Sequence, residues 1–159
     1  MLHLIPPPLH RRLYRLADWG RRRWWRIRKP HRRSAHIVAF DEAGKVLLVR
    51  HSYGRPVWVF PGGGVGRRED PAAAAAREFR EELACELTDL VPLGPCEIEE
   101  SGSHDERHVF AARLAGVPAP DQREIVAAAL FEPDALPDDS GRYVRHWIDQ
   151  ARTARSQQR

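Results

Sequence analysis

Residues 61–85 read PGGGVGRREDPAAAAAREFREELAC and combine a glycine cluster, a helix start and a dense set of carboxylates. Asp70 followed by Pro71 is a strong signal for a helix start, because Asp caps free backbone N–H groups and Pro suits the first helical position. Five alanines follow, and alanine has the highest intrinsic helix propensity. These features predict a helix that begins at Pro71 and ends near Ala84.

The predicted helix has two distinct faces. The apolar stripe expected to face a core consists of Ala72, Ala76, Phe79 and Leu83. The acidic face, with spacing i, i+3 and i+4, consists of Glu78, Glu81 and Glu82. Carboxylates on adjacent turns repel one another, and Mg²⁺ is a cation that joins a few carboxylates to substrate phosphates. A solvated acidic surface is the alternative, but the preceding glycines, which allow a bound group to approach closely, favour a binding site.

The spacing of these residues resembles the Nudix box, G-x5-E-x7-R-E-U-x-E-E-x-G-U, in which U is a bulky aliphatic residue. The matching stretch begins at Gly63, reaches Glu69 after five residues and, after seven more, continues as REFREELAC over residues 77–85. Two positions depart from the pattern, Ala84 in place of glycine and Cys85 in place of an aliphatic residue. Since glycine at a helix end supports a left-handed cap, Ala84 leaves the shape of that turn open but removes no ligand.

The resemblance covers about residues 34–150 and implies the α/β/α Nudix fold, a mixed sheet sandwiched between helices. It also implies an enzyme, a pyrophosphohydrolase that requires Mg²⁺ or Mn²⁺. Such an enzyme hydrolyses the phosphoanhydride bond of a small substrate in which a nucleoside diphosphate is linked to another group. Neutralised phosphate charge and an activated water are what this reaction needs.

Individual roles follow from the resemblance. The implied metal ligands are the backbone carbonyl of Gly62 and the carboxylates of Glu78, Glu81 and Glu82. Glu78 is a further ligand or the general base, and Glu124, before the last strand, is the alternative base or a fourth ligand. Arg77 orients the carboxylates through ion pairs, while Gly63 and Glu69 shape the loop of the box.

The sequence does not name the substrate. Residues 102–108, GSHDERH, carry no marker of a Nudix subfamily that we can identify. Candidate substrate contacts lie in or near the loop before the apolar stretch 57–60, and each can equally be an ordinary loop or core residue. These candidates are Arg50, Tyr53, Arg55 and Trp58.

Charge is distributed unevenly along the chain. Residues 1–33 contain 11 Lys or Arg and one acidic residue, whereas the remainder contains 15 Lys or Arg and 21 acidic residues. We therefore expect a basic N-terminal arm, residues 1–33, followed by a Nudix hydrolase domain, residues 34–155. A helical stripe within the arm consists of Leu9, Leu13, Leu16, Gly20, Trp24 and Ile27.

Three interpretations of this basic amphipathic helix remain open. It can dock against its own domain or a second subunit of a homodimer, with its arginines solvated. It can lie on an anionic membrane surface. It can also bind nucleic acid through phosphates, with residues 9–33 as the contact region. The last two interpretations suggest an alternative function, a nucleotide-sensing or RNA-end-processing Nudix module that uses the arm.

The rest of the sequence predicts strands and one more helix. Residues 34–40 and 45–51 read as a hairpin, and the final helix covers residues 140–155. Further strands are expected at residues 57–60, 87–100 and 106–114, and one more follows Glu124 within residues 124–133. No apolar run approaches the ~20 residues that span a membrane. Two cysteines without a secretory signal favour a reducing compartment, so we expect a cytoplasmic protein, with a location at the membrane periphery as the alternative.

Overall fold

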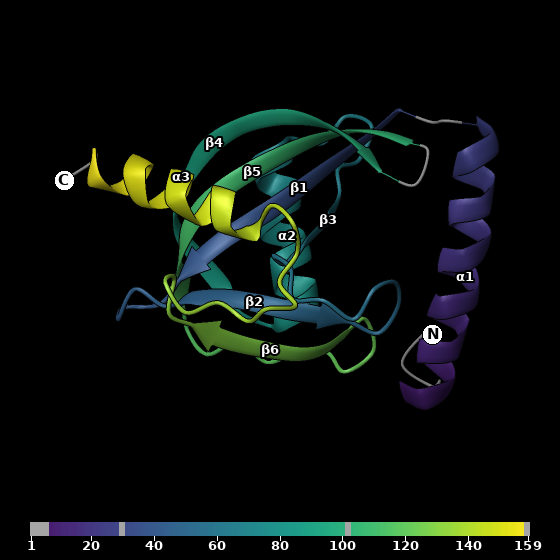
Figure 1. The fold of residues 1–159 in the computed structure, drawn as a ribbon, viewed down its shortest axis with the longest axis horizontal. Coiled ribbons are helices and arrows are strands. Elements are labelled where there is room, and N and C mark those ends of the chain that lie inside the picture. Colours follow the sequence, from purple (N-terminus) through teal and green to yellow (C-terminus); the bar gives the residue numbers. More distant parts are fainter. Residues whose placement is uncertain (1–6, 29–30, 101–102, 158–159) are drawn as a thin grey trace.

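A mixed sheet forms the centre of the protein in the computed structural model, which describes residues 7–28, 31–100 and 103–157 (Figure 1). The strand order is β4-β5-β1-β2-β6, and a short strand β3 pairs with β1 beside this path. The strands are β1 (His31–Phe40), β2 (Val46–His51), β3 (Gly62–Gly64), β4 (Glu86–Glu100), β5 (Ser103–Ala115) and β6 (Ile125–Phe131). The helices are α1 (Pro7–Arg28), α2 (Pro71–Leu83) and α3 (Val144–Ser156).

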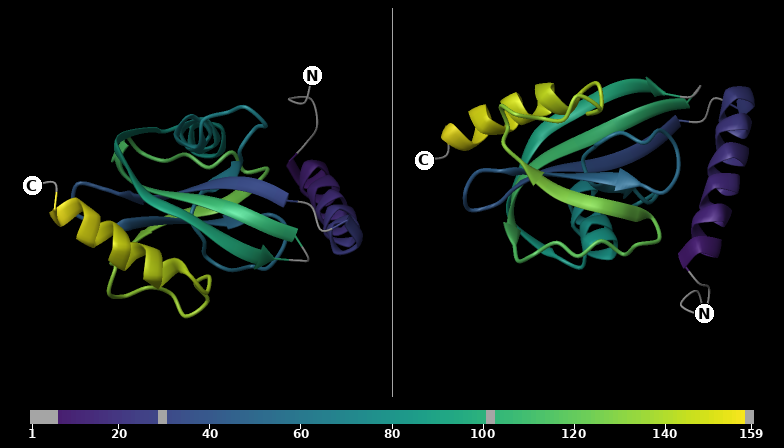
Figure 2. Two further views of the ribbon diagram at one scale, coloured as in Figure 1. Left: turned by 90° about the horizontal axis from the view of Figure 1, so that it is seen from above. Right: turned by 60° about the horizontal axis from the view of Figure 1, so that its bottom comes forward.

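Helices α2 and α3 cover opposite faces of the sheet, as Figure 2 shows. Successive side chains of a strand point to opposite faces, so β1 supplies both cores. Ile37 packs in the core with Phe79 of α2, whereas Val38 packs in the core with Trp147 and Ile148 of α3. This arrangement confirms the predicted α/β/α sandwich with a mixed sheet.

The central strand β1 is paired differently from the predicted hairpin. The hairpin turn is present, but β1 and β2 share only the register pair Phe40 and Val46. β1 instead runs parallel to β5 along its whole length and antiparallel to β3 from Ser34 to His36. β3 pairs with the side of β1 on which β2 would otherwise pair. The two strands of the predicted hairpin therefore separate after the turn.

The segment before α2 also differs from the prediction. Residues 57–60 form two isolated bridges, Val49 with Val59 and Trp58 with Ser140, rather than a strand. The glycines, expected to form a loop, pair with β1 as β3. Gly62 has φ +148°, and a Cβ there would lie 2.1 Å from the carbonyl oxygen of Ala35, so this close pairing requires glycine.

The apolar face of α2 is rotated from the predicted stripe. Phe79 and Leu83 are fully buried as expected. The fully buried alanines, however, are Ala74 and Ala75, whereas the two alanines of the predicted stripe are half-buried. The helix begins as predicted, since the side chain of Asp70 accepts a hydrogen bond from the backbone N–H of Ala73 at 3.0 Å.

Helix α1 docks against the domain, but not through its apolar stripe. The Tyr14 ring stacks on Tyr53 with centroids 5.8 Å apart, and Nε of Arg15 donates to the Ser52 carbonyl oxygen at 3.0 Å. Asp18 is buried, while the described leucines and tryptophans of the helix are exposed. In the described residues no helix is both long enough and apolar enough to cross a membrane.

Ala84 ends α2 in the left-handed conformation that a glycine usually provides. Its φ is 48° and its ψ is 34°, and its N–H donates to the carbonyl oxygen of Arg80 at 2.9 Å. The turn of the box therefore keeps its shape without glycine. A side chain in this conformation carries a steric cost that glycine does not have.

We expect Ala84→Gly to raise the free energy of unfolding by about 1 kcal/mol, because it relieves that cost. The measurement is denaturant unfolding followed by circular dichroism. The matched control is Ala76→Gly in the interior of α2, which should lower stability by about 1 kcal/mol or more. Loss of stability in Ala84→Gly would contradict the left-handed cap.

Candidate active site

A cavity of about 790 Å³ lies at the N-terminal end of β1. It lies between β1, the glycines of β3, the carboxylate face of α2 and the inner face of α1. Its charged and imidazole-bearing wall residues include Asp18, Arg32, Arg33, His36, His51, Arg67, Glu78, Glu82, Arg107 and Glu124. Acidic groups of α2 thus face basic groups of β1 and β5 across one space.

Glu82 is the buried carboxylate of this cavity, with 5% of the residue exposed. The backbone N–H of Gly62 donates to its Oε2 at 3.2 Å. Burial raises the pKa of Glu82 to about 9, and the nearby charges of Glu124, Glu78 and Asp121 act in the same direction. Desolvation and like charge both disfavour the ionised carboxylate, so this group needs either a proton or a cation.

A three-residue cluster could hold that cation. His51, Glu82 and Glu124 each offer a ligand atom, and these atoms all lie within 4.8 Å of one another. Nδ1 of His51 is buried and has no hydrogen-bond partner within the described part of the chain. Burial lowers the pKa of His51, which favours the neutral imidazole that coordinates metals. The donor set therefore fits a divalent cation.

Glu124 is held in place from two sides. Its Oε1 accepts a short hydrogen bond from the Tyr53 hydroxyl, and its backbone carbonyl accepts one from the Ser52 N–H at 2.8 Å. Its own N–H donates to the carboxylate of Asp121 at 3.0 Å. Tyr53 is therefore the one predicted substrate contact that lines the cavity, and it also touches a candidate ligand.

Arg77 connects the loop of the box to the acidic face of α2. Its guanidinium donates to both oxygens of Glu69, at 2.9 and 3.1 Å, and to Oε1 of Glu78 at 2.9 Å. It also donates to the carbonyl oxygen of Gly64 at 3.2 Å. Its hydrogen bonds, and that from the Gly66 N–H, lower the pKa of Glu69 to about 2. Arg77 and Glu69 thus form a brace within the box.

Glu78 lies directly against Gly63. A Cβ on that glycine would lie 2.4 Å from the carboxyl carbon of Glu78, so a side chain at position 63 would displace the carboxylate. Burial raises the pKa of Glu78, although its pairing with Arg77 acts in the opposite direction. A raised carboxyl pKa suits a group that accepts a proton near neutral pH.

Other predicted site residues lie outside this cavity. The Glu81 side chain is 61% exposed and pairs with Arg77 at 3.4 Å. Arg50 pairs with Asp139 and stacks over the Trp58 ring, 4.6 Å from its centroid. Arg55 is exposed. The lining of the cavity includes none of Glu81, Arg50, Arg55 and Trp58.

The basic wall of the cavity was not predicted. It includes Arg32 and Arg107, which flank the buried carboxylate of Asp105 at 3.7 and 3.1 Å, respectively. The Ser34 hydroxyl donates to the same carboxylate at 2.8 Å. These residues meet because β1 and β5 are parallel, with Ser34 opposite Arg107. No local sequence pattern reports this register, whereas the run of basic residues at 32–33 could have indicated part of the wall.

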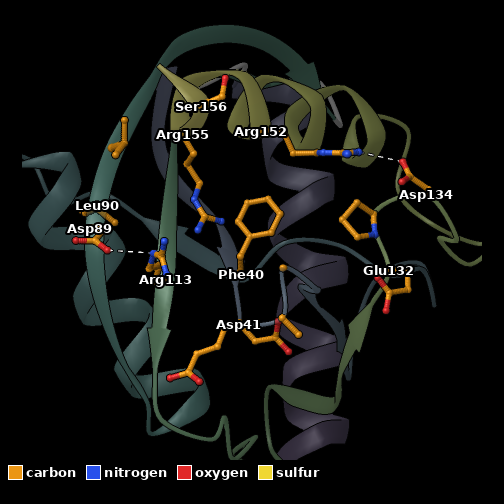
Figure 3. A pocket seen from close by; sticks show the side chains of 15 residues that line it. Phe40, Asp41, Asp89, Leu90, Arg113, Glu132, Asp134, Arg152, Arg155 and Ser156 are labelled. Carbon is orange, nitrogen blue, oxygen red and sulfur yellow. Dashed lines mark hydrogen bonds and ion pairs between the residues drawn. The ribbon is translucent and has the colours of Figure 1, made fainter. Parts of the chain in front are cut away.

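A larger cavity, of about 980 Å³, lies at the other end of β1 (Figure 3). Its arginines are engaged with nearby groups: Arg113 with Asp89 at 3.2 Å, and Arg152 with Asp134 at 3.0 Å. The Arg155 guanidinium lies over the Phe40 ring, 4.7 Å from its centroid. No residue of the acidic face of α2 lines it, so the smaller cavity is the candidate active site.

Comparison with known proteins gives a domain-length family match. A family model described as the NUDIX domain matches residues 30–151. An RNA pyrophosphohydrolase of Acidiphilium cryptum (strain JF-5) is 39% identical over 66 residues, which cover 39% of this chain and 40% of that protein. An isopentenyl-diphosphate Delta-isomerase of Agromyces mediolanus is 32% identical over 116 residues, 65% of this chain and 54% of that protein. The matches thus span roughly half or less of each relative.

Solved structures share the fold. A MutT NUDIX hydrolase from Burkholderia pseudomallei superposes with a TM-score of 0.69 at 25% identity, covering 76% of this chain and 97% of that chain. A C. elegans Ap4A hydrolase superposes with a TM-score of 0.67 at 20% identity, covering 79% and 98% of the two chains. The second likeness concerns the fold alone.

The raised pKa of Glu82 predicts a specific pH dependence of stability without metal. Between the ordinary carboxyl pKa and about 9, the folded state holds a proton that the unfolded state releases, so stability falls as pH rises. Glu82→Gln removes this titration. In chelator near pH 8, the variant should be more stable than the wild type by about 2 kcal/mol or more, with the gap closing near pH 5.

Denaturant unfolding across this pH range measures the effect. Glu81→Gln, which changes an exposed carboxylate on the same helix, is the matched control and should follow the wild type. The prediction is contradicted if the free energy of unfolding of the wild type, relative to that of Glu82→Gln, does not fall between pH 5 and 8. Glu82 would then titrate near the ordinary carboxyl pKa.

Proposed function

This chain belongs to the NUDIX domain family, and from that membership and the site we propose that it is a divalent-metal-dependent pyrophosphohydrolase. The proposed reaction is hydrolysis of a phosphoanhydride bond in a nucleotide-derived substrate. The observation that carries the proposal is the buried carboxylate of Glu82, which faces Glu124 and His51 in a cavity whose other wall is basic. We also propose the division into an arm, predicted as residues 1–33, and a hydrolase domain, predicted as residues 34–155, and we assign all of β1, which begins at His31, to the domain.

The metal site in this proposal is built by α2, β2 and the segment before β6. We assign Glu82, Glu124 and His51 as its ligands, with Glu81 and the Gly62 carbonyl as the ligands that the resemblance adds. A divalent ion bound there supplies charge neutralisation at the phosphates and lowers the pKa of a bound water. Mg²⁺ and Mn²⁺ suit the carboxylates, and Mn²⁺ also accepts the imidazole of His51.

Proton transfer from water falls to a carboxylate of the same cavity. Glu78 has the geometry for this role, since Gly63 leaves room for its carboxylate and Arg77 fixes it at 2.9 Å. Glu124 is the alternative base, oriented by Tyr53. Arg77 acts as a positioning residue because its guanidinium holds Glu69 and Glu78 together.

The arginines of the opposite wall would bind the substrate phosphates. Arg32, Arg33, Arg67 and Arg107 line the cavity, and guanidinium groups match phosphate oxygens in charge and geometry. The buried Asp105 holds Arg107 in place from behind. The names of the curated relatives share the diphosphate group, which supports a diphosphate-containing substrate.

A second candidate within this function is the 5′ end of RNA. Several curated relatives are named RNA pyrophosphohydrolases, with identities of 34–41% over 54–70 residues. These short matches support the hydrolase chemistry more than they support RNA as the substrate. A small nucleotide derivative therefore remains the first proposal.

Hydrolysis should stop in chelator and return with Mg²⁺ or Mn²⁺, because the buried carboxylates need the cation. Glu82→Gln should lower kcat by at least about 100-fold, since it removes an electrostatic contact that acts in the transition state. Release of phosphate after a coupled phosphatase measures both effects. Glu42→Gln, at the other end of β1, is the control and should retain wild-type turnover. Chelator-resistant hydrolysis would contradict the proposed metal site.

A substrate panel distinguishes the two candidates. Nucleoside diphosphate derivatives and an RNA with a 5′-triphosphate should be compared by kcat/KM in Mg²⁺, and we expect the small derivatives to be preferred. Arg107→Gln should raise KM by about tenfold for the preferred substrate because it removes a phosphate contact. Arg113→Gln, in the larger cavity, provides the matched control. Equal effects of the two substitutions would reject the basic wall as the phosphate site.

A further inference from the structure

Exposed apolar side chains gather on helix α1. In the part of the chain that the structure describes, seven large apolar residues are exposed, and five of them belong to this helix. They are Leu9, Leu13, Leu16, Trp19 and Trp24. The other two, Val117 and Leu130, lie on separate segments. Leu9, Leu13, Leu16 and Trp24 recur at helical spacing, so they form one stripe, which we call the outer stripe.

The outer stripe is turned away from the protein. Three residues contact the domain, Tyr14, Arg15 and Asp18. Tyr14 and Asp18 are four positions apart and lie on the side of the helix opposite the outer stripe. The Tyr14 ring stacks on Tyr53, and Asp18 is only 6% exposed, whereas Leu16 is 67% exposed. In Figures 1 and 2, α1 stands at one edge of the molecule, beyond the ends of the strands. Among the residues that the structure describes, none covers the outer stripe.

The charge of α1 indicates which kind of partner can cover the outer stripe. The helix contains eight arginines and a single carboxylate, the buried Asp18. Arg12, Arg15 and Arg23 are exposed. An anionic bilayer matches both properties, because its headgroups attract arginines and its acyl region accepts leucine and tryptophan.

The other occupants match less of the surface. A nucleic acid would satisfy the arginines through its phosphates but would leave the leucines of the outer stripe in water. A second copy of this chain would cover the leucines but would bring two sets of eight arginines together. The bilayer alone accounts for the leucines and the arginines at once.

We propose that α1 docks this protein onto the surface of an anionic phospholipid bilayer. The helix lies in the plane of the interface, with the outer stripe inserted and the flanking arginines among the headgroups. On its inner face the same helix contributes Asp18 to the wall of the catalytic cavity, so docking would hold that cavity beside the membrane. This inference does not depend on the proposed hydrolysis.

Vesicle binding of the full chain tests the proposal. Sedimentation should be compared for vesicles of phosphatidylcholine alone and of equal parts phosphatidylcholine and phosphatidylglycerol. We expect partition onto the anionic vesicles to be at least about tenfold stronger and to weaken with salt. Trp19 and Trp24 should report insertion through a blue shift of tryptophan fluorescence.

The double variant Leu13→Gln/Leu16→Gln removes apolar contact without changing charge, and should lower partition onto anionic vesicles by at least about tenfold. Val117→Gln is the matched control, since Val117 is 88% exposed but lies away from α1, and should bind like the wild type. The circular dichroism spectrum and the denaturant unfolding midpoint should be unchanged in both, which excludes misfolding as the cause.

Four results would overturn the proposal. The wild type could stay in the supernatant with anionic vesicles, or the double variant could bind them as well as the wild type does. Sedimentation equilibrium could instead show a dimer that the double variant dissociates, with no vesicle binding. An RNA oligonucleotide that binds the wild type and the double variant alike, while vesicles bind neither, would assign the arginines to nucleic acid.

Discussion

The site depends on one carboxylate that the fold buries beside others. Glu82 lies in the last turn of α2, near the Gly62 N–H and close to Glu124 and His51. Water cannot stabilise its charge there, so its pKa rises to about 9 and the folded protein needs a proton or a cation at this point. In the proposed function, a divalent ion at this point would replace the proton and relieve the repulsion between the neighbouring carboxylates.

The backbone brings these groups together by close approach. Glycine at position 62 lets β3 pair tightly with β1, and glycine at position 63 leaves the space that the Glu78 carboxylate fills. The Arg77–Glu69 brace then ties the glycine loop to the helix. These constraints act within residues 62–78, which explains why one short stretch of sequence organises the acidic side of the cavity.

Much of the fold could be predicted because the signals are local. The cap at Asp70, the spacing of the glutamates and the family resemblance predicted α2, its acidic face and the α/β/α sandwich. The parallel register of β1 and β5 could not be predicted in this way, since it joins residues about 70 positions apart and sets Arg107 and Ser34 side by side. For the same reason His51 was missed: its neighbours Glu82 and Glu124 come from other elements. The helix of the arm was predicted, but the face that contacts the domain was not. That face carries Tyr14 and Asp18, whereas the leucines lie on the exposed face.

The central claim is that Glu82 stays protonated without metal and ionises when the cation binds. Carbon-13 NMR of glutamate side-chain carboxyls, titrated with pH in chelator and assigned with Glu82→Gln, measures this directly. We expect one carboxyl to titrate near pH 9 without metal, and its signal to become that of a carboxylate at neutral pH on addition of Mg²⁺. If the Glu82 carboxyl titrates near its ordinary value in chelator, or is unaffected by Mg²⁺, the account is contradicted.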